Sequence, residues 1–370
     1  MHLNVLKVMQ MHEIGSRDQL LNHVRDFVAL KVSERPELLA AFLVGSVARA
    51  DPLWANITDF DVIFVDPDPP LDLEPCLLWN EFLLIDVQYF RPEDYENRPI
   101  LKRDAMRGQS LYDAVPLHDS KNFFALLQAY VRGQFDTIEN VIARSADAFR
   151  RAQLHYDEIS ELRNIPVPIP VDPNDIKHLH AVIDWAATAV LMLAYKPRYG
   201  RRQVLCFGEV LSQMGQSHIL ALAEQSVGFS AISDDDIDDM RKQWLEIFRA
   251  AGKFHKGHWD DDRCAHPLKE QYYMDGFEKL AAVGHARASL FLMEYTAAAA
   301  FNHVLTHAPV EAAAPYVRQY TRWMDMSGKG SAKHFSDCLV QLSELLRRVE
   351  YLIYEFAKDN GIVYELTMDR

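Results

Sequence analysis

Three stretches in the N-terminal third decide the fold: Leu43-Val-Gly-Ser-Val-Ala-Arg-Ala-Asp-Pro52, Asp59-Phe-Asp-Val-Ile-Phe-Val65 and Phe82-Leu-Leu-Ile-Asp-Val87. Apolar residues dominate the second and third stretches, and an apolar run leads into the first, as in buried strands. We therefore predict strands over residues 38–44, 59–65 and 81–90, with a short turn of helix at 47–50 and a helix before the first strand. This alternation indicates an α/β arrangement.

The rest of the chain has a helical pattern, because apolar residues recur there at helical spacing. The predicted helices cover residues 121–162, 175–195, 203–226, 234–251, 276–307, 311–325 and 332–358. The expected fold class is α+β: a small α/β head with a mixed sheet over residues 1–120, followed by a larger all-helical domain over residues 121–370.

Composition and charge exclude several classes of protein. The 39 Lys and Arg against 53 Asp and Glu give a net charge of −14, which argues against an extended nucleic-acid partner and suits a cationic small molecule better. Four scattered cysteines favour a reducing, cytoplasmic setting. We expect no membrane partner, because the N-terminus lacks a signal-peptide pattern and no run approaches about 20 apolar residues.

Gly45 and Ser46 lie where the first predicted strand gives way to a helix start. Glycine allows a ligand to approach the backbone closely, and the free amides of a helix N-terminus favour an anion. Ser46 adds a hydroxyl donor. This corner is therefore a candidate phosphate-binding site.

Asp59 and Asp61 are two residues apart on a predicted strand, so both carboxylates point to the same face. Two such carboxylates repel each other unless a cation lies between them, and Mg²⁺ with triphosphate oxygens suits that position. Asp86 is a third acid, in an otherwise apolar strand where it is costly without a partner. If the two strands are neighbours, three carboxylates converge in the layout of two-metal nucleotidyl transfer.

These residues resemble the signature of the polymerase-β-like nucleotidyltransferase superfamily. The order and spacing of Gly45-Ser46, Asp59-x-Asp61 and Asp86 are similar to its stand-alone small-molecule branch, which includes aminoglycoside and lincosamide nucleotidyltransferases. Arg49 falls where that branch often has an arginine after Gly-Ser, and Leu111-Tyr-Asp113 resembles the stretch that closes its catalytic domain. The resemblance covers about residues 20–120, and the helical remainder matches only in kind.

The resemblance implies a role for each residue. Gly45, Ser46 and Arg49 would bind the nucleotide, and Asp59, Asp61 and Asp86 would be the catalytic, metal-binding acids. Mg²⁺ would be the cofactor and ATP, or another nucleoside triphosphate, the co-substrate. The general base stays open between Asp86 and a helical-domain carboxylate such as Asp184 or Glu158.

Two further patterns favour structural interpretations, and two others have alternatives that stay open. The segment from His255 to His266 carries His, Asp and Cys residues at no standard zinc spacing, which favours a polar loop. Gly328-Lys-Gly-Ser331 imitates a phosphate-binding loop but lacks its upstream glycine and strand, which favours a flexible turn between helices. Asp184, in an apolar helix, is either in a structural ion pair or a site residue, and Arg198 lies in a basic loop that meets phosphates or complements a helix end.

The sequence thus predicts a cytoplasmic nucleotidyltransferase that moves a nucleoside monophosphate, AMP from ATP by preference, to a hydroxyl of a small molecule such as an aminoglycoside. Two alternatives are kept. One is adenylylation of a protein or RNA partner of the toxin–antitoxin type, and the other is a non-catalytic nucleotide-binding protein.

Overall fold

The computed structural model describes residues 17–51, 59–70, 74–80, 83–164, 170–257, 259 and 263–367. The chain divides into two compact units. Residues Met1–Asp136 and Gly257–Lys279 form the first, and Thr137–Lys256 and Leu280–Arg370 form the second.

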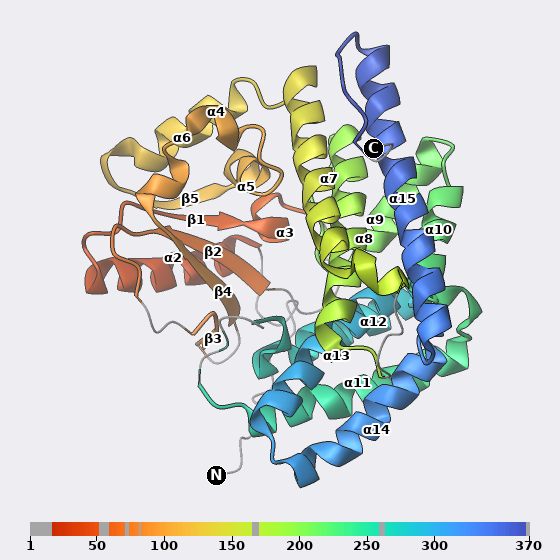
Figure 1. Cartoon of the computed structure of the whole chain (residues 1–370). Coiled ribbons are helices and arrows are strands. Elements are labelled where there is room, and N and C mark those ends of the chain that lie inside the picture. The colour runs from red at the N-terminus through yellow and green to blue at the C-terminus, as the bar shows by residue number, and fades with distance from the viewer. Residues whose placement is uncertain are drawn as a thin grey trace. The chain divides into compact units, whose positions relative to one another are not determined.

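A mixed β-sheet forms the centre of the first unit (Figure 1). Within the described residues its strands lie in the order β3–β4–β2–β1–β5. β4 pairs in parallel with β2, and the other neighbours are antiparallel. The strands are β1 (Ala40–Val44), β2 (Asp59–Val65), β3 (Cys76–Trp79), β4 (Leu83–Phe90) and β5 (Val115–Asp119).

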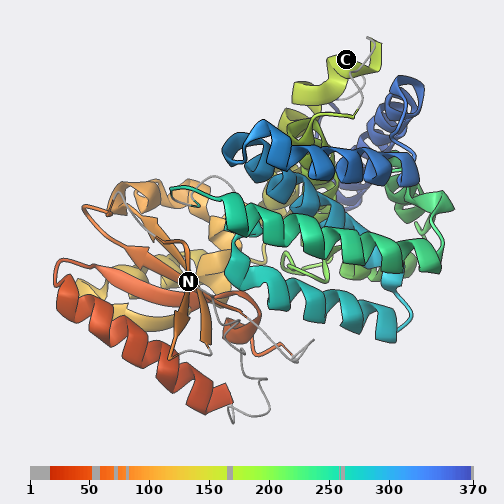
Figure 2. The same ribbon diagram turned by 90° about the horizontal axis from the view of Figure 1, so that it is seen from below.

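Helices cover both faces of this sheet (Figures 1 and 2). Phe60, Val62 and Phe64 alternate along β2 toward one face, where they pack with apolar residues of α2. Phe42 and Ile63 point to the other face, where residues of α5 and α6 complete a second core. The helices are α2 (Arg17–Glu34), α3 (Gly45–Ala48), α4 (Arg98–Leu101), α5 (Arg107–Asp113) and α6 (Phe123–Arg132), with 3-10 turns at Pro92–Tyr95 and Ser120–Asn122.

The α+β class and the three central strands were predicted correctly from the sequence. Strands β3 and β5 were missed. Both are edge strands, so each pairs on one side only, and β5 contains Pro116, which an edge strand tolerates. The first unit also extends past the expected boundary at residue 120, because α6 packs on the sheet and residues 257–279 belong to it.

The second unit is helical, and α7 and α8 run side by side in it (Figure 1). Its helices are α7 (Ile138–Ser160), α8 (Pro173–Leu193), α9 (Gln203–Gln213), α10 (His218–Ser226), α11 (Asp234–Phe254), α13 (Ala286–His307), α14 (Val310–Met326) and α15 (Ala332–Asp359). α12 (Glu270–Ala282) begins in the first unit and ends in the second. Short 3-10 turns lie at Glu161–Asn164 and Phe229–Ala231 in the second unit, and at Arg263–Ala265 and Pro267–Lys269 in the first.

Glycines divide two of the predicted helices. The span 203–226 breaks after α9 at Gly215, with φ +71°, and the span 276–307 breaks after α12 at Gly284, with φ +80°. A positive φ ends an α-helix, and glycine adopts it without a steric penalty. The span 121–162 is likewise two helices, α6 and α7.

Of the helices in the described ranges, α8 alone is long and apolar enough to cross a membrane by length and composition. However, 78% of its apolar window is buried inside the protein. It contacts α7, α9, α13 and α15. α8 is therefore a core helix of the second unit.

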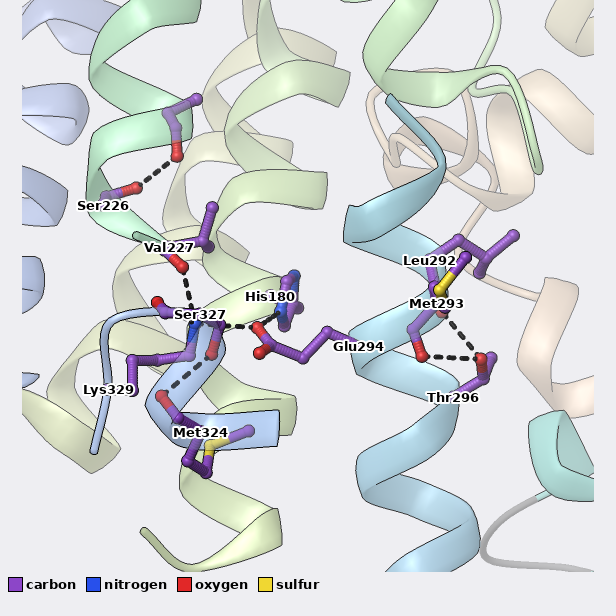
Figure 3. A network of polar contacts seen from close by, with 11 residues as sticks. His180, Ser226, Val227, Leu292, Met293, Glu294, Thr296, Met324, Ser327 and Lys329 are labelled. Carbon is purple, nitrogen blue, oxygen red and sulfur yellow. Dashed lines mark hydrogen bonds and ion pairs between the residues drawn. The ribbon is translucent and has the colours of Figure 1, made fainter. Parts of the chain in front are cut away.

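A buried polar network joins the turn between α14 and α15 to α8, α13 and the end of α10 (Figure 3). Lys329, in the turn between α14 and α15, is fully buried, and its Nζ lies 3.1 Å from Glu294 Oε2. The same Nζ donates to the carbonyls of Val227 and Ser327 at 2.5 and 3.3 Å, and His180 Nε2 lies 2.7 Å from Glu294 Oε2. The turn Gly328-Lys-Gly-Ser331, whose sequence imitates a phosphate-binding loop, is thus held by its buried lysine. The expectation of a flexible turn was wrong for Lys329.

Candidate functional site

Asp59, Asp61 and Asp86 meet on one face of the sheet. β2 and β4 are parallel neighbours in a register that pairs Asp61 with Asp86. One carboxylate oxygen from each of the three residues lies within 4.8 Å of the others. The convergence expected if these strands were neighbours is therefore present.

The carboxylates occupy one end of a face whose other end is apolar. Ile63 and Val65 follow Asp59 and Asp61 at two-residue spacing along β2 and belong to the core beneath α5 and α6. The strand thus changes from buried apolar to acidic along its length, which places the acids at the rim of a rigid core.

Crowding raises the free energy of the charged site. Burial, then Asp59 and Asp86, raise the pKa of Asp61 well above its usual value, and Lys269 and Arg263 oppose this only in part. Oδ1 of Asp86 is buried and has no hydrogen-bond partner among the described residues. Both features are those of a site that gains stability when it shares a cation.

Gly45 borders this cluster. Its φ is +79°, and a Cβ at this position would lie 2.3 Å from Asp61 Oδ2. Any larger residue would therefore displace the carboxylate as well as strain the backbone. The glycine that the sequence suggested for close approach of a ligand also makes room for an acid.

Arg17 fixes the turn that follows Gly45. From α2, its Nη2 donates to the carbonyls of Val47 and Ala48 at 2.8 and 3.2 Å, and its Nε donates to Val47 at 3.1 Å. These carbonyls end the single turn of α3, so Arg17 caps it and holds Gly45 and Ser46 in place. No pattern in the sequence indicates this role of Arg17.

The predicted nucleotide contacts differ in their surroundings. Ser46 is half-buried, and its carbonyl accepts from the Asp51 amide at 3.0 Å. Arg49 directs its guanidinium to Asp51, with Nη2 2.8 Å from Oδ2. Burial raises the pKa of Asp113, and the positive charge of Arg49 opposes this only in part. Arg49 therefore belongs to a local charge network beside the corner.

Lys269 is a member of the site that the sequence analysis missed. Its Nζ forms an ion pair with Asp86 Oδ2, and both side chains are less than a tenth exposed. Burial alone would lower the lysine's pKa, but Tyr273, Asp86 and Asp59 outweigh burial and raise it well above the usual value. Lys269 thus stays charged and holds one oxygen of Asp86. It follows Asp86 by 183 residues, so local spacing gives no signal for it.

Two other side chains lie close to the acidic cluster. Cys76 is kept in its neutral form, and His266 is held by hydrogen bonds. Cys76 faces Asp86 across β3 and β4, and burial followed by Asp86 raises the pKa of its thiol. His266 accepts at Nδ1 from the Leu268 amide, and its Nε2 lies 2.6 Å from Glu74 Oε1. The His266 ring is therefore used structurally, which agrees with the polar-loop interpretation for this residue; His258 and residues 260–262 lie outside the described residues.

The remaining candidates for general base lie in the second unit. Arg198 binds Asp184 through Nε at 3.0 Å and through Nη2 at 2.5 Å, so Asp184 forms the structural ion pair that was one of its two expected roles. Arg198 is therefore an ion-pair partner of α8, the helix that carries Asp184. Glu158 is exposed on α7.

The residues of the first unit fit Mg²⁺. Carboxylate oxygens are the donors that this ion prefers, and Asp86 Oδ1 offers one that is not used in a hydrogen bond among the described residues. The raised pKa of Asp61 favours the same conclusion, because a cation would offset the repulsion that raises it.

No protein-family model matches this chain, and no curated protein matches it closely enough in sequence to count as a relative.

Proposed function

We propose that this protein is a Mg²⁺-dependent nucleotidyltransferase that moves a nucleoside monophosphate, AMP from ATP by preference, to a hydroxyl group of a small molecule. The observation that carries the proposal is the convergence of Asp59, Asp61 and Asp86 within 4.8 Å beside Gly45. Three carboxylates supply the hard oxygen ligands that suit a metal–triphosphate complex.

Each residue has a role in this proposal. Asp59, Asp61 and Asp86 would hold the metal, and Gly45 and Ser46 would contact the triphosphate. When bound, Mg²⁺ supplies positive charge that stabilises the leaving pyrophosphate and the acceptor alkoxide. Lys269 keeps one oxygen of Asp86 fixed, so that Oδ1 keeps its orientation.

The reaction balances without a further reactant. The acceptor oxygen forms a bond to the α-phosphorus, the bond to the bridging oxygen of pyrophosphate breaks, and the acceptor proton leaves to a base. Asp86 acts as a metal ligand in this proposal, because Lys269 holds its Oδ2 and the metal would take its Oδ1, and Asp184 is bound by Arg198. Arg49 is proposed to bind the phosphates, which requires its guanidinium to break the ion pair with Asp51.

The net charge of −14 suits a cationic acceptor such as an aminoglycoside, and a cytoplasmic setting suits both ATP and the scattered cysteines.

Labelled ATP tests the proposal. The protein is incubated with Mg²⁺, a pool of aminoglycosides and other polyols, and either α- or γ-labelled ATP, beside the double variant Asp59→Asn/Asp61→Asn. We expect α-label, and no γ-label, on an acceptor with the wild type only. Transfer of γ-label would contradict nucleotidyl transfer. α-Label on a protein or RNA from added lysate would keep the reaction but replace the acceptor class, and nucleotide binding without any transfer would favour a non-catalytic binding protein.

A further inference from the structure

Three histidines that are distant in sequence come together in the second unit. His255 directly follows α11, and His303 and His307 lie four residues apart at the end of α13. One ring nitrogen from each lies within 4.8 Å of the others. The ring centroids are 5.3 to 5.5 Å apart. The sequence analysis considered His255 with its neighbours up to His266, and the structure pairs it with other residues.

From this geometry we propose that His255, His303 and His307 form a zinc-binding site, separate from the acidic cluster of the first unit. Three imidazoles with a fourth position left for water is a common ligand set for Zn²⁺. Two histidines at i and i+4 lie on one face of a helix, which allows both rings to bind a single ion. Zn–N bonds of about 2.0–2.1 Å require nitrogens roughly 3.3 Å apart, so small ring rotations bring the set into range.

The donor chemistry selects the metal. Imidazole nitrogens suit Zn²⁺ and its neighbours in the transition series, whereas Mg²⁺ prefers oxygen ligands. The two clusters of this protein thus differ in the ion that each is built to hold. The histidine site does not depend on the proposed nucleotidyl transfer.

The surroundings also favour a cation. α11 and α13 pack against each other, and both end at the histidines, so the carbonyl ends of two helices meet there (Figure 1). These ends carry partial negative charge. Lys256, directly after His255, adds a positive charge that a bound ion must tolerate.

One of the three histidines is buried, and the other two are partly exposed to solvent. His303 is 8% exposed and is therefore held by packing, whereas His255 and His307 are half-buried and reachable from solvent. The ring of Phe254 contacts that of Tyr316 in α14, with centroids 6.2 Å apart. A bound ion would consequently tie the ends of α11 and α13 beside α14 and stabilise this part of the unit.

Zinc titration tests the proposal. The full chain is purified without a polyhistidine tag, stripped with a chelator and titrated with Zn²⁺ against a chromophoric chelator, in wild type and in Asp59→Asn/Asp61→Asn. We expect one equivalent bound in both, and a rise in melting temperature with Zn²⁺. His303→Gln and His307→Gln should each weaken binding at least about 100-fold. His218→Gln, an exposed histidine on α10, is the matched control and should change nothing.

The outcomes separate clearly. Loss of zinc in the acid variant, or unchanged affinity in both histidine variants, would overturn the proposal, as would no binding at micromolar concentrations. If His303→Gln fails to fold, two readouts decide in its place: the visible absorption of tetrahedral Co²⁺ in the wild type, and its loss in the more exposed His307→Gln.

Discussion

Asp61 carries a carboxyl group that burial and two acidic neighbours drive toward its protonated form. A residue whose charge is unfavourable in the folded state lowers stability, and this is common where residues are selected for binding a cation. The proposed function therefore predicts a conflict between stability and activity at this residue.

Replacing Asp61 with Asn tests that conflict. Without divalent metal, Asp61→Asn should raise the melting temperature, by about 2–4 °C for each kcal/mol of repulsion removed. Mg²⁺ with a nucleotide should stabilise the wild type and leave the variant unchanged. The measurement is a thermal melt with and without metal and nucleotide. A variant less stable than the metal-free wild type would contradict the account of repulsion.

Gly45 offers a second test at the residue scale. Gly45→Ala should cost about 1–3 kcal/mol from the positive φ and also displace Asp61, whose Oδ2 would lie 2.3 Å from the new Cβ. Nucleotidyl transfer should fall at least about 100-fold. Gly215→Ala is the matched control, because it has a similar φ of +71° and nothing within 4 Å of the added Cβ. Equal activity in the two variants would contradict the role assigned to Gly45.

At the scale of elements, the turn between α14 and α15 depends on Lys329, whose Nζ pairs with Glu294 and donates to the carbonyls of Val227 and Ser327. Among the residues that the structure describes, the side chains that contact the Glu294 carboxylate are those of Lys329 and His180. Lys329→Met leaves this buried carboxylate with His180. Unfolding in urea should show a loss of about 3–5 kcal/mol.

The double variant Lys329→Met/Glu294→Gln is the control for that loss. It should be more stable than the single variant, because no uncompensated charge remains. A single variant as stable as the wild type would mean that the pair does not hold the turn.

The sequence allowed prediction of elements whose pattern is local. β2 was predicted with both boundaries correct, because its run of β-branched and aromatic residues stops at the turn-forming segment Asp66-Pro-Asp-Pro-Pro70. The partners of Asp86 and His255 could not be found in this way. Lys269 and His303 lie 183 and 48 residues further along the chain, and only the fold brings each pair together.

At the scale of the whole molecule, stability should fall in acid. Burial lowers the pKa of His180, so the unfolded chain takes up this proton first as the pH falls below about 6.5. The pKa of Glu294 is also lowered, since Lys329 and His180 outweigh burial, which would raise it. The unfolded state thus binds more protons at both residues, and stability is lost from about pH 6.5 downward through the folded-state pKa values.

Thermal melts from pH 8 to pH 4 would measure this loss. The melting temperature should fall by about 2–4 °C per kcal/mol lost. His180→Gln should flatten the curve near pH 6, whereas His218→Gln should keep the slope of the wild type. Parallel curves for wild type and His180→Gln would show that this histidine does not set the acid limit.

The measurement that most directly tests the central claim does not require the acceptor. Isothermal titration follows binding of an ATP analogue with a non-cleavable α–β bridge to the wild type and to Asp59→Asn/Asp61→Asn, each with and without Mg²⁺. The acidic cluster predicts binding to the wild type that requires Mg²⁺ and is lost in the variant. Equal binding to both proteins, or binding that is indifferent to Mg²⁺, would contradict the assignment of Asp59, Asp61 and Asp86 as a metal–nucleotide site.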